Sequence, residues 1–322
     1  TAEEIERIVE TVPGGAANIQ DIYPLAPLQE GILFHHLMGG DSDPYLAAQL
    51  FSFDNRERLD RYLEAMQAVV DRHDILRTAV LWEGLPEPVQ VIWRKAVLPA
   101  EEVRLEAGAG DAVKQLYARY HPRSFRMDVR QAPMLRVVIA RDEEQDRWLM
   151  LQLRHHLASD HTTLEVMQKE IEAYLRGEAD SLPAPLPFRE LVAQARLGVS
   201  QQEHEEFFRR LLGDVEEPTA PFGSLNIQGD GRDLEQSYLK VDEALGRRIR
   251  ENARRLRVSA ASLCHVAWAQ VAARASGRDD VVFGTLLFGR MQGGKGADRV
   301  MGVFTNTLPV RIRVGEETVE SA

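Results

Sequence analysis

Three histidines and one aspartate fall within seven positions of the stretch LQLRHHLASDHTTLEV, residues 151–166. They are His155, His156, Asp160 and His161. Apolar segments flank them on both sides, and polar groups that become buried are destabilising unless they are hydrogen-bonded. Imidazole titrates near neutral pH, so a histidine here could accept and return a proton while the aspartate fixes the local geometry. The pattern therefore favours general-base catalysis, or the orientation of an attacking group, at this position.

Three other interpretations of this cluster remain open. The histidines could be structural, each satisfied by hydrogen bonds at the end of a strand. A metal site could use histidine and carboxylate ligands, although the chain has no His-x-His or His-Glu-x-x-His spacing. A nucleophilic triad could use Ser159, but no Gly-x-Ser-x-Gly turn surrounds it, and the single cysteine, Cys264, lies in an apolar segment.

The cluster lies where a predicted strand meets a predicted helix. The segment WLMLQLRHH follows MLRVVIA after the charged turn RDEEQDR, a pattern typical of a β-hairpin. Apolar residues then recur at helical spacing as far as Gly177, which is a favoured residue at the C-terminal end of a helix. Thr162 or Thr163 could cap the start of this helix. Adjacent residues of a strand point to opposite faces, so His155 and His156 are expected to point in different directions.

Strand and helix patterns recur along the rest of the chain. An amphipathic helix is predicted in LDRYLEAMQAVVDRHD, and the segments ILRTAVLW and PVQVIW are predicted to pair as strands. Further helices are predicted in QQEHEEFFRRLLGD, EALGRRIRENARRLR and SAASLCHVAWAQVAARASGR, the last apolar on most sides and so expected to be buried. DVVFGTLLFGR and MGVFTNTLPVRIRV are rich in strand-forming residues. Both halves mix strands and helices, which predicts the α+β class.

The length and the proline distribution predict two lobes. A chain of 322 residues exceeds what one ordinary hydrophobic core holds. The segment GEADSLPAPLPF carries prolines at positions 183, 185 and 187, and proline-rich segments act as extended spacers. We therefore expect one lobe over residues 1–178 and a second lobe over residues 179–322.

The composition excludes several classes of partner. The net charge of −11 argues against nucleic acid, because neutralising phosphates requires clustered lysine and arginine. No apolar run approaches the length of a membrane span, and the charged start TAEEIERIVE does not have the pattern of a signal peptide. One cysteine excludes an intramolecular disulfide and suits a reducing compartment, so we expect a cytoplasmic location.

The segment HHLASDH resembles the HHxxxDG signature of condensation domains of nonribosomal peptide synthetases, within the chloramphenicol-acetyltransferase-like superfamily. Four other segments are similar to motifs of that family and stand in the same order. They are YPLAPLQEGILFHHL (23–37), RHDILRTAV (72–80), GRDDVVFGTLLFGR (277–290) and MGVFTNTLPVRI (301–312). The resemblance covers essentially the whole chain.

The resemblance implies two acetyltransferase-like lobes in a V, with the active site in a tunnel between them. It implies amide bond formation between a donor acyl or peptidyl thioester and an acceptor amine. Both substrates would arrive on phosphopantetheine arms, from an upstream donor and a downstream acceptor carrier domain, beside an adenylation domain. The domain itself would bind no cofactor and no metal, and it would serve the biosynthesis of peptide antibiotics or siderophores.

The family also implies roles for individual residues. His156 matches the second histidine of the signature, which the family uses at the reaction centre. His155 is expected to hold, by hydrogen bonds, the corner at which the predicted strand meets the predicted helix. Asp160 matches the signature aspartate, which pairs with an arginine from the other lobe. We nominate Arg290 as that arginine, with Arg77 as the alternative.

The sequence departs from the family pattern at several places. His161 stands where the signature has glycine, which puts a titratable ring on the substrate side of the corner, and Asp74 stands where glutamate is usual. Asn306 lies in the motif that lines the tunnel. The chain ends soon after this motif at Ala322, so we expect the second lobe to be incomplete and transfer by these residues alone to be weak.

Several alternative activities remain open. An epimerisation domain of the same fold would use the same signature, but no glutamate stands in a recognisable epimerase motif. His35 and His36 partly match the histidine pair of domains that both epimerise and condense, although they are also expected as ordinary residues on a helix face. Two further alternatives are a free acyltransferase that uses coenzyme A and a degenerate module that only recruits a partner.

Overall fold

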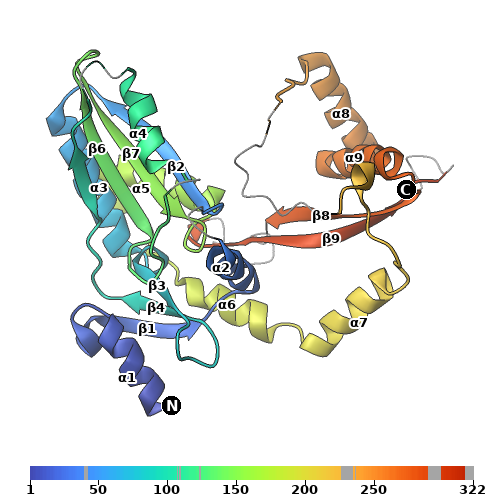
Figure 1. The fold of residues 1–322 in the computed structure, drawn as a ribbon, viewed down its shortest axis with the longest axis horizontal. Coiled ribbons are helices and arrows are strands. Elements are labelled where there is room, and N and C mark those ends of the chain that lie inside the picture. Colours follow the sequence, from blue (N-terminus) through green and yellow to red (C-terminus); the bar gives the residue numbers. More distant parts are fainter. Residues whose placement is uncertain are drawn as a thin grey trace. The chain divides into compact units, whose positions relative to one another are not determined.

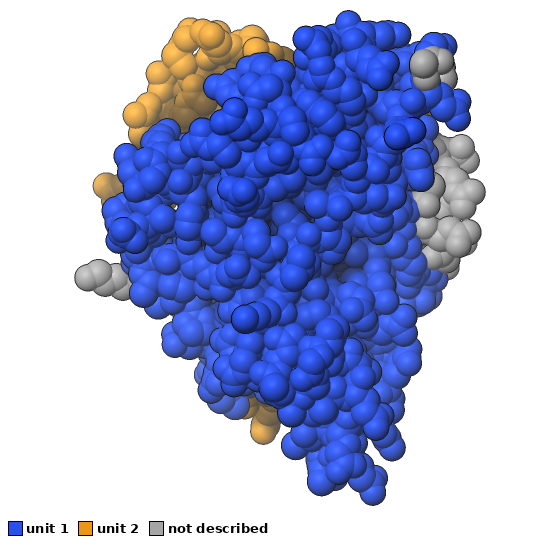
Figure 2. All heavy atoms as spheres, turned by 90° about the vertical axis from the view of Figure 1, so that its left-hand side faces the viewer, with its two compact units in different colours: residues 1–198, 288–306 blue, residues 199–287, 307–322 orange. Residues whose placement is uncertain are grey.

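A computed structural model describes residues 1–39, 43–106, 108, 110–122, 125–225, 235, 237–288 and 299–315. The chain divides into two compact units, which Figure 2 colours separately. The first unit comprises residues 1–198 and 288–306, and the second comprises residues 199–287 and 307–322. The boundary expected at residue 179 therefore differs from the boundary in the structure, which follows Gly198. Residues 288–306 also belong to the first unit.

Among the described residues, a four-stranded sheet carries the main core of the first unit, in the order β2-β7-β6-β5 (Figure 1). Its strands are β2 (Leu46–Phe53), β7 (Arg147–His155), β6 (Leu135–Asp142) and β5 (Ala100–Val103). β6 and β7 form the predicted hairpin, β2 pairs antiparallel with β7, and β5 runs parallel to β6. Every residue of β7 from Leu149 to Leu153 is buried, so both faces of this strand are covered.

A three-stranded sheet lies in the same unit, in the order β1-β4-β3. Its strands are β1 (Ile19–Pro24), β4 (Val89–Trp93) and β3 (Thr78–Leu81), and each neighbouring pair is antiparallel. The predicted pairing of ILRTAVLW with PVQVIW is confirmed. Helix α1 (Ala2–Thr11) packs onto this sheet through Ile8, which shares a small apolar cluster with Val91 and Trp93.

Helices complete the first unit. They are α2 (Pro27–Met38), α3 (Arg56–Arg72), α4 (Ala112–Tyr120), α5 (His161–Arg176) and α6 (Phe188–Leu197). α3 and α5 lie side by side, and α3 also contacts β2 and β7 (Figure 1). α6 follows the proline-rich segment yet belongs to the first unit, because Phe188 and Val192 are buried and Arg196 donates a hydrogen bond to the carbonyl of Leu25. Within the described ranges, none of the helices has the length and hydrophobicity needed to cross a membrane.

Helix α5 begins differently from the prediction. Its N-cap is Asp160, not Thr162 or Thr163: the Asp160 carboxylate accepts hydrogen bonds from the backbone N–H of Thr163 at 2.8 Å and from its hydroxyl at 2.9 Å. An aspartate side chain reaches the N–H groups of the first turn and satisfies donors that have no partner within the helix. The helix ends at Gly177, as predicted, in the left-handed conformation that glycine adopts without strain.

The segment before β9 is fastened to this first turn of α5. Gly302 donates from its backbone N–H to the Thr163 hydroxyl at 2.9 Å. Its carbonyl oxygen lies 3.0 Å from the same hydroxyl, whose single proton is shared between this oxygen and Asp160. Phe304 donates from its N–H to the second carboxylate oxygen of Asp160 at 3.3 Å. Gly302 has a φ of 143°, and an added Cβ would meet the ring of Phe188 at 2.2 Å, so only glycine fits there. The segment MGVF, residues 301–304, is therefore part of the core of the first unit.

The second unit is smaller and more exposed. Its elements are α7 (Gln201–Leu212), α8 (Glu243–Leu256), α9 (Ala260–Ser276), β8 (Asp280–Phe288) and most of β9 (Thr305–Arg313), with β8 and β9 hydrogen-bonded to each other. The expectation that the helix over 260–276 is buried is wrong in the described structure. Ala269, Ala272 and Ala273 pack against Val281, whereas Trp268 on another side of the helix is 51% exposed.

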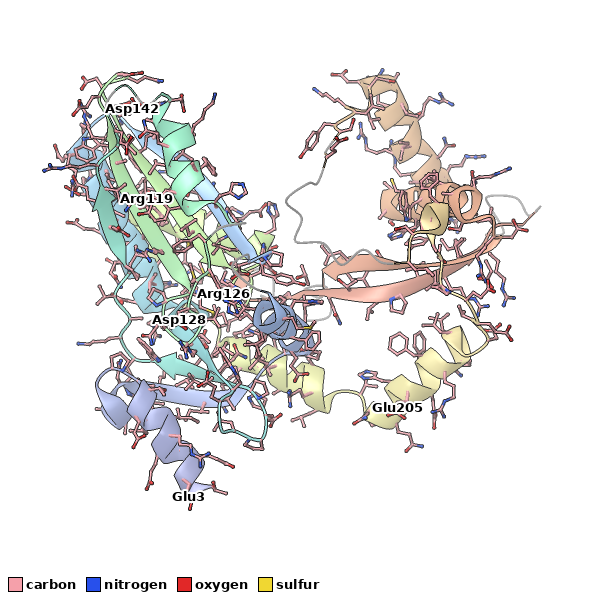
Figure 3. The ribbon with its side chains drawn as sticks, in the orientation of Figure 1. Glu3, Arg119, Arg126, Asp128, Asp142 and Glu205 are labelled. Atoms are coloured by element: carbon pink, nitrogen blue, oxygen red, sulfur yellow. The ribbon has the colours of Figure 1, made fainter. Side chains whose placement is uncertain are left out.

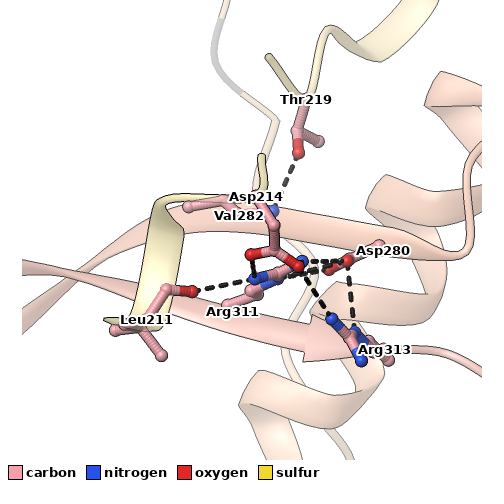
Figure 4. Close-up of polar contacts among 7 residues, drawn as sticks. All are labelled: Leu211, Asp214, Thr219, Asp280, Val282, Arg311 and Arg313. Carbon is pink, nitrogen blue, oxygen red and sulfur yellow. Dashed lines mark hydrogen bonds and ion pairs between the residues drawn. The ribbon is translucent and has the colours of Figure 1, made fainter. Parts of the chain in front are cut away.

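An arginine with two aspartates ties the strands of this unit to α7 (Figure 4). Arg311 of β9 contacts Asp280 at 2.6 Å and Asp214 at 3.0 Å, and it also donates to the carbonyl of Leu211 at 2.8 Å. Hydrogen bonding to Arg311 lowers the pKa of Asp214 to about 2. Arg313 reaches the same two carboxylates at 3.3 Å but is 69% exposed.

Replacing Asp160 tests the link between α5 and the segment around Gly302. Asp160→Ala removes the acceptor for Thr163 and Phe304, and we expect the free energy of unfolding to fall by roughly 1–3 kcal/mol. Asp160→Asn keeps an oxygen at the cap and should retain most of the stability. Chemical denaturation of the three proteins measures this. An equal loss of stability in both variants would contradict the helix cap as the main contribution of Asp160. It would indicate instead a partner that needs the negative charge, such as Arg290.

Replacing Arg311 tests the cluster in the second unit. Arg311→Met should lower the Tm by a few degrees at neutral pH, and Arg313→Met should lower it less because that side chain is more exposed. The pKa of Asp214 is depressed in the folded state, so its contribution is present above about pH 4 and is lost as the pH falls towards 2. Thermal unfolding should therefore show that the difference in Tm between wild type and Arg311→Met becomes smaller as the pH falls over this range. A gap that is independent of pH would rule out the ion pairs as its cause.

Candidate active site

The predicted corner lies between the end of β7 and the start of α5. β7 ends at His155, and His156 is the first residue of the turn that follows. Arg154, which precedes them, lines a small cavity together with Ser159 and Leu164 of the α5 side. His155 lies on the opposite side, with its ring edge-on to that of His36 from α2 at 5.2 Å between centroids.

His156 is half-buried and is held by two hydrogen bonds. Its backbone N–H donates to the carbonyl of Tyr45 at 2.9 Å, and its Nδ1 lies 3.0 Å from the carbonyl oxygen of Ser159. A carbonyl oxygen only accepts, so Nδ1 carries the proton and Nε2 carries the lone pair. This tautomer leaves Nε2 as the nitrogen that can accept a proton from a substrate.

The surroundings of His156 favour its neutral form. Burial lowers the pKa of His156, and the charges of Arg154 and His155 lower it further, while the hydrogen bond to Ser159 and the charge of Asp160 oppose this. Arg154 is itself half-buried, and its Nε has no hydrogen-bond partner among the described residues. The net direction is downward, so the imidazole is neutral at physiological pH and able to act as a base.

His155 is fully buried, and its hydrogen bonds determine its tautomer. Its Nδ1 accepts from the backbone N–H of Leu157 at 3.1 Å, so the proton lies on Nε2. That nitrogen lies 3.1 Å from Oδ2 of Asp43, although the N–H direction is not aligned for a straight hydrogen bond. The expectation that His155 holds the corner by hydrogen bonds stays a prediction: the bond from Leu157 fits it, whereas Nε2 has no aligned partner among the described residues.

Asp43 and His36 were not expected at the corner. Nδ1 of His36 lies 3.0 Å from the same oxygen of Asp43, and all three side chains are buried. Burial alone would raise the pKa of Asp43, but hydrogen bonds from His155 and His36 hold it well below its usual range. Burial lowers the pKa of His155 despite the neighbouring carboxylate. The prediction that His36 is an ordinary helix-face residue is therefore wrong, whereas its neighbour His35 is exposed.

The cluster of His36, Asp43 and His155 has the composition of a metal site. Its ligand atoms all lie within 4.8 Å of one another, and two imidazoles with a carboxylate suit zinc. A ligating nitrogen must present a lone pair, and a metal-bound histidine ordinarily donates its other N–H to an acceptor. His155 does the reverse, because its Nδ1 accepts a hydrogen bond and its Nε2 carries the proton. The contacts therefore fit a hydrogen-bonded cluster better than a metal site.

The remaining candidates lie in different surroundings. Asp160 is buried and directs both carboxylate oxygens to Thr163 and the backbone of Phe304. Arg290 lies outside the described residues. Arg77 donates to Gln20 and to the carbonyl of Trp93, so the structure does not pair it with the signature aspartate.

The two residues expected on the substrate side are both exposed. His161 is the first residue of α5, its side chain is 74% exposed, and its Nε2 lies 3.3 Å from Glu165. Asn306 is an exposed residue near the start of β9.

Comparisons with known proteins agree on one family. The sequence profile of the condensation domain matches residues 19–322. Malpibaldin synthetase of Mortierella alpina is 52% identical over 319 residues, which make up 99% of this chain and 6% of that protein. A linear gramicidin synthase protein of Brevibacillus parabrevis is 32% identical over 322 residues, covering 95% of this chain and 4% of that protein. The chain thus spans a small part of the length of these relatives.

A solved structure agrees with the fold. The condensation domain of the monacolin K polyketide synthase superposes with a TM-score of 0.69 at 20% identity, covering 92% of this chain and 68% of that one. At this level of identity the likeness concerns the fold alone, and it confirms the predicted mixture of strands and helices. Together with the profile match, it shows that the chain belongs to the condensation-domain family.

Proposed function

We propose that this domain forms the amide bond of a nonribosomal peptide, with His156 at the reaction centre. The observation that carries the proposal is the state of that histidine: Nδ1 is committed to Ser159, the pKa is lowered, and Nε2 is left as an acceptor. The membership in the condensation-domain family supports the reaction class. The donor would be an acyl or peptidyl thioester and the acceptor an aminoacyl thioester with a free amine.

The reaction asks for little covalent help from the protein. The acceptor nitrogen attacks the thioester carbonyl carbon, its proton passes to Nε2 of His156, and the thiolate of the donor arm leaves and is protonated. A thioester is already activated, so holding the two groups in line can contribute ~7–11 kcal/mol of the barrier. A positioned base contributes a typical factor of ~10²–10⁴.

The other candidates would support the site without reacting. Asp160 would keep the corner rigid from within the protein, with Arg290 proposed as its charged partner. His161 and Asn306 are proposed to face substrate, because both side chains are exposed. His161 lies at the start of α5, and Asn306 lies near the start of β9. The substrates would be presented by an upstream and a downstream carrier domain on phosphopantetheine, next to an adenylation domain, in the cytoplasm. No cofactor of the domain's own is needed for this chemistry.

Replacing His156 tests the assignment of the base. His156→Ala should reduce single-turnover transfer between loaded donor and acceptor carriers by ~10²–10⁴ while leaving the circular dichroism spectrum unchanged. The matched control is His35→Ala, which removes an exposed imidazole of α2. Transfer at the wild-type rate by His156→Ala would exclude it from the chemistry. Exchange of the donor α-proton without amide formation in the wild type would instead indicate epimerisation.

The pH dependence tests the same residue in a second way. A lowered pKa keeps His156 neutral to more acidic pH, so activity should fall only below the ordinary histidine value of about 6.5. The acid limb of the single-turnover rate against pH measures this value. Arg154→Met removes a positive charge that lowers the pKa of His156, so it should move the acid limb to higher pH. An acid limb above pH 7 in the wild type would contradict the proposed state of the base.

A further inference from the structure

We infer that Asp43 is a positioning residue for the histidine corner, acting on the ring of His155 and on the main chain of His156. Its effect on turnover rests on the proposed function of His156, whereas its effect on His155 does not. Asp43 stands outside the motif that identifies the corner and is joined to it by two separate sets of contacts.

The first set runs through the side chain. Oδ2 of Asp43 lies 3.1 Å from Nε2 of His155 and 3.0 Å from Nδ1 of His36. All three side chains are at most 4% exposed, so water does not compete for these contacts. A buried carboxylate is stable only when it is paired, and each imidazole N–H that faces it is a donor. The charge of Asp43 thus favours the Nε2–H tautomer of His155 and fixes the orientation of its ring.

The second set runs through the backbone. Oδ1 of Asp43 accepts from the N–H of Tyr45 at 3.2 Å, and its carbonyl accepts from the N–H of Leu46 at 3.1 Å. This turn presents the carbonyl of Tyr45 to the N–H of His156 at 2.9 Å. Leu46 is the first residue of β2 and pairs with His155. The same aspartate therefore sets the turn that holds the backbone of the proposed base.

The surroundings hold Asp43 in place from the other side. Its N–H donates to the carbonyl of Pro122 at 3.1 Å. Arg126, labelled in Figure 3, donates to the carbonyls of His36 and Gly39 at the C-terminal end of α2. A cation is stabilising at the C-terminal end of a helix, where the last carbonyl groups lack partners within the helix. Among the described residues, the titratable groups facing the carboxylate are His36 from α2 and His155 from β7, with Tyr45 from its own turn.

A pair of substitutions separates the two sets of contacts. Asp43→Asn keeps the size of the side chain and an oxygen for the N–H of Tyr45, but it replaces the charged acceptor between the two imidazoles. Asp43→Ala removes both sets. The matched control is Asp54→Asn, the same chemical change at an aspartate that is 82% exposed and paired only with Arg58 among its described contacts.

The first measurement does not depend on turnover. Nitrogen-15 NMR of the histidine side chains in the full chain should assign the Nε2–H tautomer to His155 in the wild type and in Asp54→Asn. In Asp43→Asn the His155 signals should shift or show mixed tautomers. A wild-type His155 protonated on Nδ1, or binding of one equivalent of zinc that is lost in His36→Ala, would overturn the inference.

The second measurement is the transfer reaction. A displacement of about 1 Å at a reacting group can lower a rate about 10²-fold, so Asp43→Asn should lower kcat by roughly 10- to 100-fold with KM little changed. Asp43→Ala should lower kcat at least as far, and Asp54→Asn should match the wild type. Wild-type kcat in Asp43→Asn would overturn the inference. An inactive wild type would count against the proposed function, while the NMR result would still decide the role of Asp43.

Discussion

The carboxylate of Asp160 is the group on which the architecture of the first unit depends. One of its oxygens accepts from the N–H of Thr163 in the first turn of α5, and the other accepts from the backbone N–H of Phe304, in a distant part of the chain. Thr163 completes the link, because its hydroxyl accepts from the N–H of Gly302 and lies within hydrogen-bond distance of the Gly302 carbonyl. A strand, a helix and the segment before β9 therefore meet at one buried charge. Removing polar groups from water is costly, and this arrangement satisfies several of them at once.

The rings of His155 and His156 are each fixed by hydrogen bonds to the surrounding backbone. His156 is fixed by one bond from its backbone and one from Nδ1, both to carbonyl oxygens. His155 is fixed by the amide of Leu157 on one side and by Asp43 on the other. Neither ring is free to exchange tautomers without losing a contact. The site thus has the preorganisation that a reaction controlled by the placement of its reactants requires.

Particular residues show how far sequence reasoning reached. The hairpin of β6 and β7, helix α5 and its end at Gly177 follow from local periodicity and glycine, and all were predicted. The cap was placed at threonine because hydroxyl residues are good caps, but the buried Asp160 reaches the same donors. The residues of α6 fell in the expected second lobe because the boundary was placed at the prolines before them, yet Phe188 packs beside Gly302. Proline content marks an extended segment and carries no information about what the next helix packs against.

By itself, the sequence determined the family and showed that the candidate residues stand between a strand and a helix, because motif order and periodicity are local properties. Only the tertiary structure brought Asp43 and His36 to His155, since that contact requires β2 to pair with β7 in one register. The tertiary structure also decided that both faces of β7 are covered. Polar side chains of this strand are therefore buried, although periodicity alone would place them on a face exposed to solvent. Burial and long-range hydrogen bonding decide which tautomer and which charge state each histidine adopts, and neither is encoded in the spacing of the residues.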